Sequence, residues 1–295
     1  MRYGFPPRLS WTTLLDVVLL DVVVIASLTA QAEGSPVVLL PASTRSAGLG
    51  GAGAALVGDA GAVFANPAGI ATIRHLSVEG SYERYLAGST MSTAALALRL
   101  GRFNWGAGAA ALDYGAVSAT DRLGVSSLVF RTGVIALGGS AKYLRQEVGG
   151  SSADAWAGDA GLAVAVFDIM ALGASVQNIG GNRGGGARLP RRTRAGFTMN
   201  YVDPQGTFRL LTTVEGQWPE GYAAVLVAGL EAGVVARGVG LVARVGATGH
   251  SAPSDASPIT VGGGVELGRL HLDYAYQGYD ALDGGRHRFG LRWTP

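Results

Sequence analysis

The sequence contains no cysteine, which excludes disulfide frameworks, thiolate zinc sites and cysteine nucleophiles. Charged residues are scarce as well, at 15% against about 25% in a typical globular chain. The 23 basic and 21 acidic side chains nearly balance, and a net charge of +2 lacks the basic surplus of a nucleic-acid-binding protein. We therefore expect no nucleic-acid partner.

Long apolar runs are almost absent, since only residues 11–28 reach the length that a helix needs to cross a bilayer. Arginines precede this run, and Ala30-Gln31-Ala32 follows it with the small-x-small pattern of a signal-peptidase site. Asp16 and Asp21 interrupt the run and argue against a permanent anchor. We predict a signal peptide at residues 1–32, cleaved after Ala32, with an uncleaved anchor as the alternative.

Glycine is abundant instead, with 47 glycines among 295 residues, more than twice the usual share of about 7%. A glycine inside a helix costs about 0.5–1 kcal/mol relative to alanine. Glycine is tolerated better where a sheet bends or where backbones approach closely. The composition thus disfavours a helical bundle and favours a β-protein.

From residue 75 onward, apolar and polar or small residues alternate in blocks of about ten, which is typical of strands with two different faces. Near the end of the chain, Leu272, Tyr274 and Tyr276 share one face and His271 and Asp273 share the other. The alternation predicts fourteen strands, at residues 75–85, 91–100, 103–114, 123–131, 134–146, 154–167, 169–178, 192–202, 207–218, 222–234, 238–248, 258–267, 269–278 and 286–294.

The connections between these strands form a second pattern, because those after even-numbered strands are short and most of the others are longer. Gly101-Arg102 and Gly268 are short connections, whereas Gly115–Arg122 and Gly149–Ser152 are predicted as longer ones. Bacterial outer-membrane barrels have this asymmetry. We predict an all-β fold, a transmembrane antiparallel up-and-down β-barrel of about 14 strands over residues 75–295, in the bacterial outer membrane. A soluble secreted β-domain is the alternative.

The segment before the barrel, residues 33–74, lacks strand alternation and is rich in glycine and alanine. A stretch of such small residues predicts a plug that packs inside the barrel. Asp59 and the Asn66-Pro67-Ala68-Gly69 motif are its candidate contact residues, because short polar side chains bond backbone groups and arginines at close range. The alternative is that Asp59 and Asn66 only form turns.

Several motifs occur in an order that resembles the FadL/PorV group of outer-membrane barrels. They are Asp59 with the Asn-Pro-Ala motif, then residues 137–144, then Val176-Gln177-Asn178-Ile179-Gly180, then residues 189–197. The resemblance covers roughly residues 43–295. It implies a fourteen-stranded barrel with the N-terminal segment folded into the lumen.

The resemblance also implies two functions. PorV/PorQ-like members serve type IX secretion, and FadL-like members pass hydrophobic molecules. Because the chain is short and has no long outer loops for a capture site, we favour a non-enzymatic, PorV/PorQ-like scaffold or handover component in protein secretion. The alternative is a FadL-like channel for uptake or export of hydrophobic small molecules. Expected partners are outer-membrane lipids, the insertion machinery, and secretion-system proteins or a hydrophobic ligand.

Charged and polar residues of mixed sign occupy the face opposite the apolar one. Inside a barrel they would either need water or pair with one another and with the plug. The predicted lumen network consists of Glu79, Lys142, Arg209, Glu215, Arg244, Glu266, His271, Asp273, Arg288 and Arg292.

Motifs for catalysis or metal binding are missing. No G-x-S-x-G sequence occurs, and the candidate serines are scattered. The four histidines are far apart, without the H-x-x-x-H spacing of a metal site. We expect neither an enzyme nor a cofactor.

The last strand alternates Phe289, Leu291 and Trp293 with polar residues or glycine. It resembles the terminal strand of outer-membrane proteins, which the insertion machinery recognises. Thr294-Pro295 departs from the usual terminal aromatic residue, and proline, which lacks an N–H, fits only where the hydrogen-bond ladder ends. We predict that these three residues form the assembly strand.

Overall fold

The computed structural model describes residues 43–84, 88–115, 118–167, 169–180, 189–201, 207–221, 223–249, 256–279 and 284–295. The predicted signal peptide at residues 1–32, and residues 33–42 of the predicted plug segment, lie outside these ranges.

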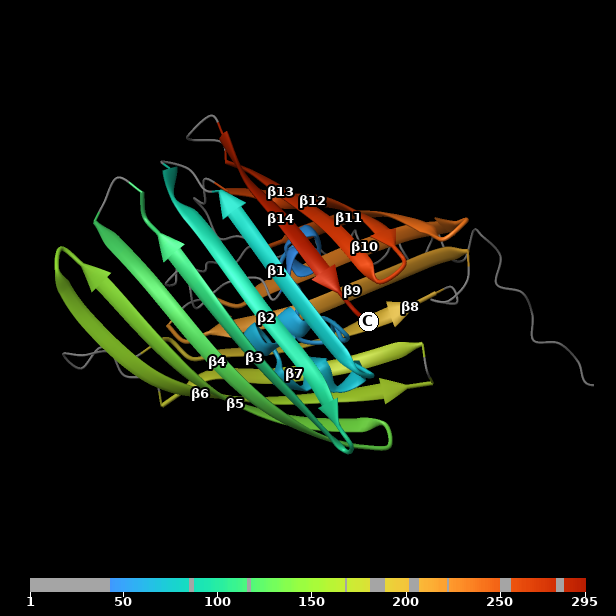
Figure 1. Ribbon diagram of the computed structural model, residues 1–295, viewed down its shortest axis with the longest axis horizontal. Coiled ribbons are helices and arrows are strands. Elements are labelled where there is room, and N and C mark those ends of the chain that lie inside the picture. The colour runs from blue at the N-terminus through green and yellow to red at the C-terminus, as the bar shows by residue number, and fades with distance from the viewer. Residues whose placement is uncertain are drawn as a thin grey trace, which may run out of the picture.

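Fourteen strands form one closed antiparallel barrel, in which each strand pairs with its neighbours in sequence and β1 pairs with β14 (Figure 1). The prediction of an all-β antiparallel barrel of about fourteen strands is confirmed. The strands are β1 (Leu76–Arg84), β2 (Thr90–Leu100), β3 (Phe103–Asp113), β4 (Ala119–Thr132), β5 (Ile135–Val148), β6 (Ser151–Val166), β7 (Met170–Ile179), β8 (Arg192–Asn200), β9 (Phe208–Pro219), β10 (Val225–Ala236), β11 (Val239–Thr248), β12 (Ala256–Leu267), β13 (Leu270–Tyr279) and β14 (Gly284–Trp293).

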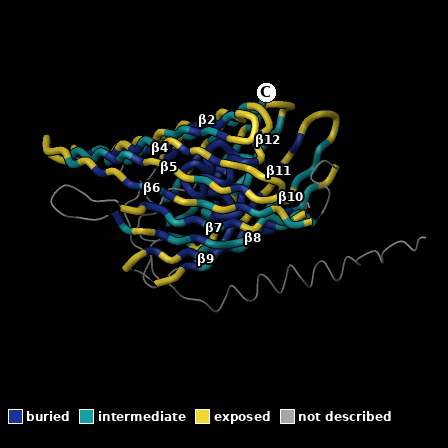
Figure 2. The backbone as a smooth tube through the Cα atoms, turned by 90° about the horizontal axis from the view of Figure 1, so that it is seen from below, coloured by how far each residue is buried: buried dark blue, intermediate teal, exposed yellow. Residues whose placement is uncertain are grey.

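The period-two pattern places successive residues on opposite faces of the barrel wall, as β11 illustrates. Val239, Leu241 and Val245 are exposed on the outside, whereas Val242 and Arg244 between them are buried inside. Figure 2 shows the same alternation of buried and exposed positions along many strands.

Large apolar side chains cover the outer face of the barrel. This is the reverse of a soluble sandwich, where the apolar face is the core, and it matches the apolar band of a membrane barrel. No helix within the described ranges is long and apolar enough to cross a membrane. The exposed apolar residues of the strands include Val78, Phe103, Leu128, Phe130, Leu137, Trp156, Leu172, Phe208, Trp218, Leu241, Val245, Val261, Leu272, Phe289, Leu291 and Trp293.

Two predicted connections are shorter in the structure than expected. The prediction of a longer connection at Gly149–Ser152 is wrong, because β6 already begins at Ser151. Gly149 and Gly150 have φ angles of 57° and 85°, the left-handed conformations that a two-residue hairpin turn requires. The connection predicted at Gly115–Arg122 is also too long, since β4 begins at Ala119 and pairs with β5 from there.

Residues 43–73, called the inner segment below, lie inside the barrel (Figure 1). They form the short helix α2 (Thr44–Gly48) and two 3₁₀ helices, η1 (Ala60–Phe64) and η2 (Pro67–Thr72). Ser43 caps α2 by accepting a hydrogen bond from the Ser46 N–H. Most residues of this segment are buried, as expected for a chain surrounded by a barrel wall.

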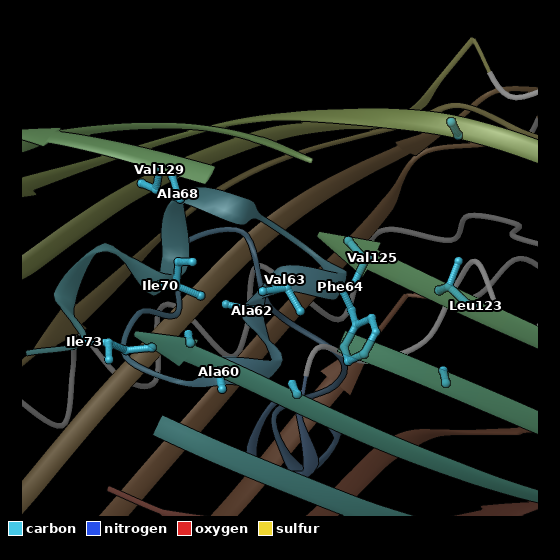
Figure 3. Close-up of a cluster of buried hydrophobic side chains, with 14 of the residues drawn as sticks. Ala60, Ala62, Val63, Phe64, Ala68, Ile70, Ile73, Leu123, Val125 and Val129 are labelled. Carbon is cyan, nitrogen blue, oxygen red and sulfur yellow. The ribbon is translucent and has the colours of Figure 1, made fainter. Parts of the chain in front are cut away.

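Apolar contacts hold the inner segment against one half of the wall (Figure 3). Val63, Phe64 and Ile70 of the two 3₁₀ helices belong to the same buried cluster as Val125 and Val129 of β4. The cluster extends over inward-facing residues of β2 to β6, most of them alanine or leucine. Burying each large apolar side chain contributes about 1.5–3 kcal/mol.

Two inward-facing glycines show why the wall carries so little side-chain volume. A Cβ atom at Gly173 of β7 would overlap the carbonyl group of Ala54, and one at Gly161 of β6 would overlap the side-chain oxygen of Asn66. The backbone of the inner segment therefore approaches the wall as closely as glycine allows.

Candidate functional site in the barrel interior

The interior has a mainly apolar half, on β2 to β6, where the Lys142–Asp159 pair is an exception, and a mainly charged half, on β8 to β14 with β1. The charged half reaches the inner segment through ion pairs and through hydrogen bonds to its backbone. Such contacts fix the segment in one position more specifically than apolar packing does, because each buried polar group needs a partner.

The carboxylate of Glu215 on β9 holds the first loop of the inner segment. Its Oε2 accepts hydrogen bonds from the N–H groups of Gly53 and Ala54, at 2.7 and 2.6 Å. Its Oε1 accepts from Arg194 Nε at 2.5 Å, and Arg194 Nη2 donates to the carbonyl of Gly51 at 2.6 Å. Charge-assisted bonds of this kind are about twice as strong as neutral ones.

Asn66 links two parts of the inner segment to the wall. Its side-chain nitrogen donates to the carbonyl of Ala54 at 2.6 Å and to that of Leu162 on β6 at 3.1 Å. Its side-chain oxygen accepts from the N–H of Ala68 at 3.0 Å and caps η2, which begins with Pro67. Asn66 is fully buried, so these contacts satisfy an amide that would otherwise be costly to bury.

Wall side chains also donate to carbonyls of the inner segment. Asn104 on β3 donates to the carbonyls of Ile70 and Ile73, at 3.1 and 3.0 Å. Gln177 on β7 donates to the carbonyl of Phe64 at 2.7 Å. Neither residue was among the predicted contacts, although both are polar residues at inward positions of their strands.

A chain of alternating charges joins α2 to β10, β11 and β13. Arg45 donates from Nε and from Nη2 to the two carboxylate oxygens of Glu231, both at 2.8 Å. Glu231 also accepts from Arg244 at 2.6 Å, and Arg244 in turn donates to Asp273 at 2.6 Å. Each charge has a neighbour of opposite sign, which offsets the cost of removing it from water.

A second chain begins at Asp59, just before η1. Asp59 pairs with Arg292 on β14, and Arg292 Nη2 lies 3.3 Å from His271 Nδ1. His271 Nδ1 lies 3.5 Å from Glu266 Oε1, and Glu266 also pairs with Arg209. This chain runs from the inner segment along β14, β13 and β12 to β9.

Arg45 connects the two chains, since its Nη1 is 3.7 Å from Asp59 Oδ2. Arg45 and Asp59 both belong to the inner segment, and neither has a side chain more than 15% exposed. Displacing the segment would therefore break both chains together.

Lys142 on β5 forms a separate pair with Asp159 on β6, at 2.7 Å. Asp159 Oδ1 also accepts from the N–H of Asn178 at 2.9 Å. Asn178 has a φ of 61°, and the pairing of β6 with β7 shifts register beside it. The pair thus stabilises a bulge in the wall.

β1 contributes two carboxylates. Glu79 accepts from the N–H of Gly61 at 3.1 Å, another contact with the inner segment. Glu83 pairs with Arg286 at 2.8 Å and with Arg288 at 3.3 Å. Glu83 therefore ties β1 to β14 where the barrel closes.

The structure places all ten residues of the predicted lumen network on the inner face of the wall. Glu79 and Glu215 contact the backbone of the inner segment, and Arg292 reaches it through Asp59. Lys142 and Arg288 pair with other wall residues. Pro67, Ala68 and Gly69 form the start of η2, while Phe289, Leu291 and Trp293 face outward on β14.

Five partners of these residues were missed from the sequence: Arg45, Glu83, Asp159, Arg194 and Glu231. The last four occupy inward positions of their strands, so the alternation itself carried the signal. Arg45 lies outside any strand, and no periodicity marks it. In the part of the chain that is described, no group of three or more His, Asp or Glu side chains is placed to hold a metal ion.

Comparison with sequence profiles of protein families gives a match to part of the chain. The profile of an uncharacterised protein family, UPF0164, matches residues 27–143. No curated protein matches the sequence.

Comparison with solved structures gives barrels of the same fold. The Pseudomonas putida toluene transporter TodX is 12% identical with a TM-score of 0.57, over 90% of this chain and 98% of that one. The Ralstonia pickettii toluene transporter TbuX is 15% identical with a TM-score of 0.55, over 85% and 98%. A Pseudomonas aeruginosa FadL homologue is 12% identical with a TM-score of 0.58, over 90% and 100%. The chain therefore has the fold of the FadL-type barrels.

Proposed function

We propose that this protein is a non-enzymatic barrel of the bacterial outer membrane that passes hydrophobic small molecules, with the inner segment as its plug. The observation that carries the proposal is a closed fourteen-stranded barrel that encloses its own N-terminal segment, on the fold of TodX, TbuX and a FadL homologue. Outer-membrane lipids are the partners of the apolar outer face, and the outer-membrane insertion machinery is the proposed partner of β14.

The apolar half of the interior supports the proposal. Met91, Leu112, Leu123 and Leu144, on β2 to β5, are all buried and face inward. Hydrophobic ligands are bound in sites lined mainly by apolar side chains with a few polar groups. In the proposed mechanism the inner segment shifts as a unit and gives up its apolar contacts with β2 to β5. An apolar molecule then passes along the inner surface of these strands.

A secretion scaffold of the PorV/PorQ type is the weaker candidate. The short connections that favour it include the two-residue turn between β5 and β6. The solved barrels with the same fold, however, are described as transporters of toluene or as a FadL homologue. We therefore rank the hydrophobic route ahead of the scaffold.

Uptake in intact cells tests the proposal. A radiolabelled monoaromatic hydrocarbon and a radiolabelled long-chain alkane are supplied to cells with and without the gene. We expect faster entry of at least one compound when the protein is present, and restoration of entry by the plasmid-borne gene. Equal entry in both strains, with fewer proteins reaching the medium in the deletion strain, would refute the transport role and support the secretion scaffold.

A further inference from the structure

A cavity of about 790 Å³ opens between the inner segment and the wall, at the barrel end where the chain terminates. Arg74, His75, Arg99 and Arg131 line it on the side of β1, β2 and β4. Its opposite side is mainly apolar. The side chains there come from the inner segment and from β6 to β9, and include Leu56, Val57, Ile169, Met170 and Leu211.

Four arginines line the cavity, and one of them, Arg45, pairs with Glu231 and Asp59. Deeper in the barrel, Arg194 and Arg244 each bind a carboxylate as well. Within the described ranges, Arg74, Arg99 and Arg131 have no ion pair, and no acidic side chain lines the cavity.

Backbone carbonyls hold two of the three guanidinium groups near the opening. Arg99 Nε donates to the carbonyl of Gly101 at 3.0 Å, and Arg131 Nη1 donates to that of Ala71 at 3.4 Å. Each guanidinium has five N–H donors, so most donors of both groups are left for a ligand. Arg99 and Arg131 are exposed, so a ligand that enters the cavity from solvent can reach both side chains.

Three guanidinium groups without a carboxylate partner around one cavity favour the binding of an anion with more than one negative charge. A phosphate group fits, because arginine binds phosphate through paired N–H donors and stays charged. The apolar side of the cavity calls for a hydrocarbon chain beside that anion, and the volume falls within the range of about 300–1,000 Å³ typical of small-molecule sites.

We propose that this cavity binds a single-chain amphiphile with a phosphate headgroup. The phosphate lies on Arg74, Arg99 and Arg131, and the chain lies against Leu56 and Met170. The proposal deepens the proposed function, since it names a class of molecule at one end of the hydrophobic route. Binding itself does not require that anything crosses the barrel.

Equilibrium binding to the purified full-length protein, in a neutral maltoside detergent, tests the proposal. The probes are dodecyl phosphate, dodecanoate and inorganic phosphate. We expect dodecyl phosphate to bind at least tenfold more tightly than either of the others, because dodecanoate carries one charge and inorganic phosphate has no chain.

A triple variant and a control double variant separate binding in this cavity from general attraction to a basic surface. Arg74→Gln with Arg99→Gln and Arg131→Gln should weaken dodecyl phosphate binding by about tenfold for each guanidinium removed. Arg102→Gln with Arg269→Gln, on exposed connections at the same barrel end but outside the cavity, should leave binding unchanged. Heat-modifiable migration in gels shows that both variants are folded.

Equal loss in the two variants, or equal affinity for dodecanoate and dodecyl phosphate, would overturn the proposal. These outcomes are independent of hydrocarbon entry into cells. Hydrocarbon entry without phosphate-specific binding would leave the route intact and remove this site. Specific binding without hydrocarbon entry would keep the site and remove the route.

Discussion

Arg194 and Glu215 form an ion pair on neighbouring strands in which each side chain is only 1% exposed. The same carboxylate accepts two backbone N–H groups of the inner segment. The wall and the segment are thus coupled through one side chain. Removing the charge of Glu215 should therefore weaken both the pairing within the wall and the attachment of the inner segment.

Glu215→Gln should lower the free energy of unfolding by about 3–5 kcal/mol, because Arg194 is left as an uncompensated buried charge. Urea unfolding in lipid vesicles, followed by tryptophan fluorescence, measures the change. Glu147→Gln is the matched control, since Glu147 pairs with Arg145 while 38% exposed and such pairs contribute about 0–1 kcal/mol. Similar losses in the two variants would contradict the assignment.

The absence of cysteine allows a single thiol to report the position of the inner segment. Ala54→Cys places it at a fully buried position beside Glu215. A water-soluble thiol reagent should label it slowly in the otherwise native protein. Labelling should be at least tenfold faster when Glu215→Gln is added, because the loop loses its anchoring carboxylate. Fast labelling in both proteins would mean that the segment is not held there.

Gly173→Ala should lower the free energy of unfolding by about 1–3 kcal/mol, the usual cost of overfilling a packed interior. The added methyl group would overlap the carbonyl of Ala54. Gly124→Ala is the control, because a Cβ there meets nothing within 4 Å. Both glycines are in strands, so the difference between the variants isolates the contact with the inner segment. A loss at Gly124 as large as at Gly173 would argue against close packing.

The outer face should tolerate charge near its edge and reject it near its middle. Val239 and Val245 are both on the outside of β11 and are both 41% exposed, but Val239 begins the strand. Val245→Arg should cost about 2–4 kcal/mol and Val239→Arg about 0–1 kcal/mol, as expected for lipid-facing arginine at different depths. Vesicle unfolding measures both. Equal, small costs would indicate that this face meets water.

Much of the fold could be predicted because a single physical pattern repeats through the chain. Alternation alone places Glu215, Arg244 and Arg292 on the inner face, because every second side chain of a strand lies on the same side of the sheet. The Gly149-Gly150 turn was less predictable, because the serines after it are equally compatible with a loop or a strand end.

Partner choice in the interior could not be predicted from alternation. Arg45 meets Glu231 across 186 residues of sequence, and Asp59 meets Arg292 across 233. Such pairs depend on the position of the inner segment within the barrel, which sequence spacing does not encode. The cavity that Arg74, Arg99 and Arg131 line was missed as well, because its apolar side comes from the inner segment and from β6 to β9, which lie far from these arginines in the sequence.

The enclosed inner segment also constrains the order of biogenesis. The segment directly precedes β1, and the ring is completed only when β1 meets β14, the strand made last. Until that final seam forms, the open sheet has a side gap through which residues 43–73 can enter. Afterwards a hydrogen-bonded wall surrounds them. Asp59 pairs with Arg292 on β14, so the inner segment is bound directly to one of the two strands that form this seam.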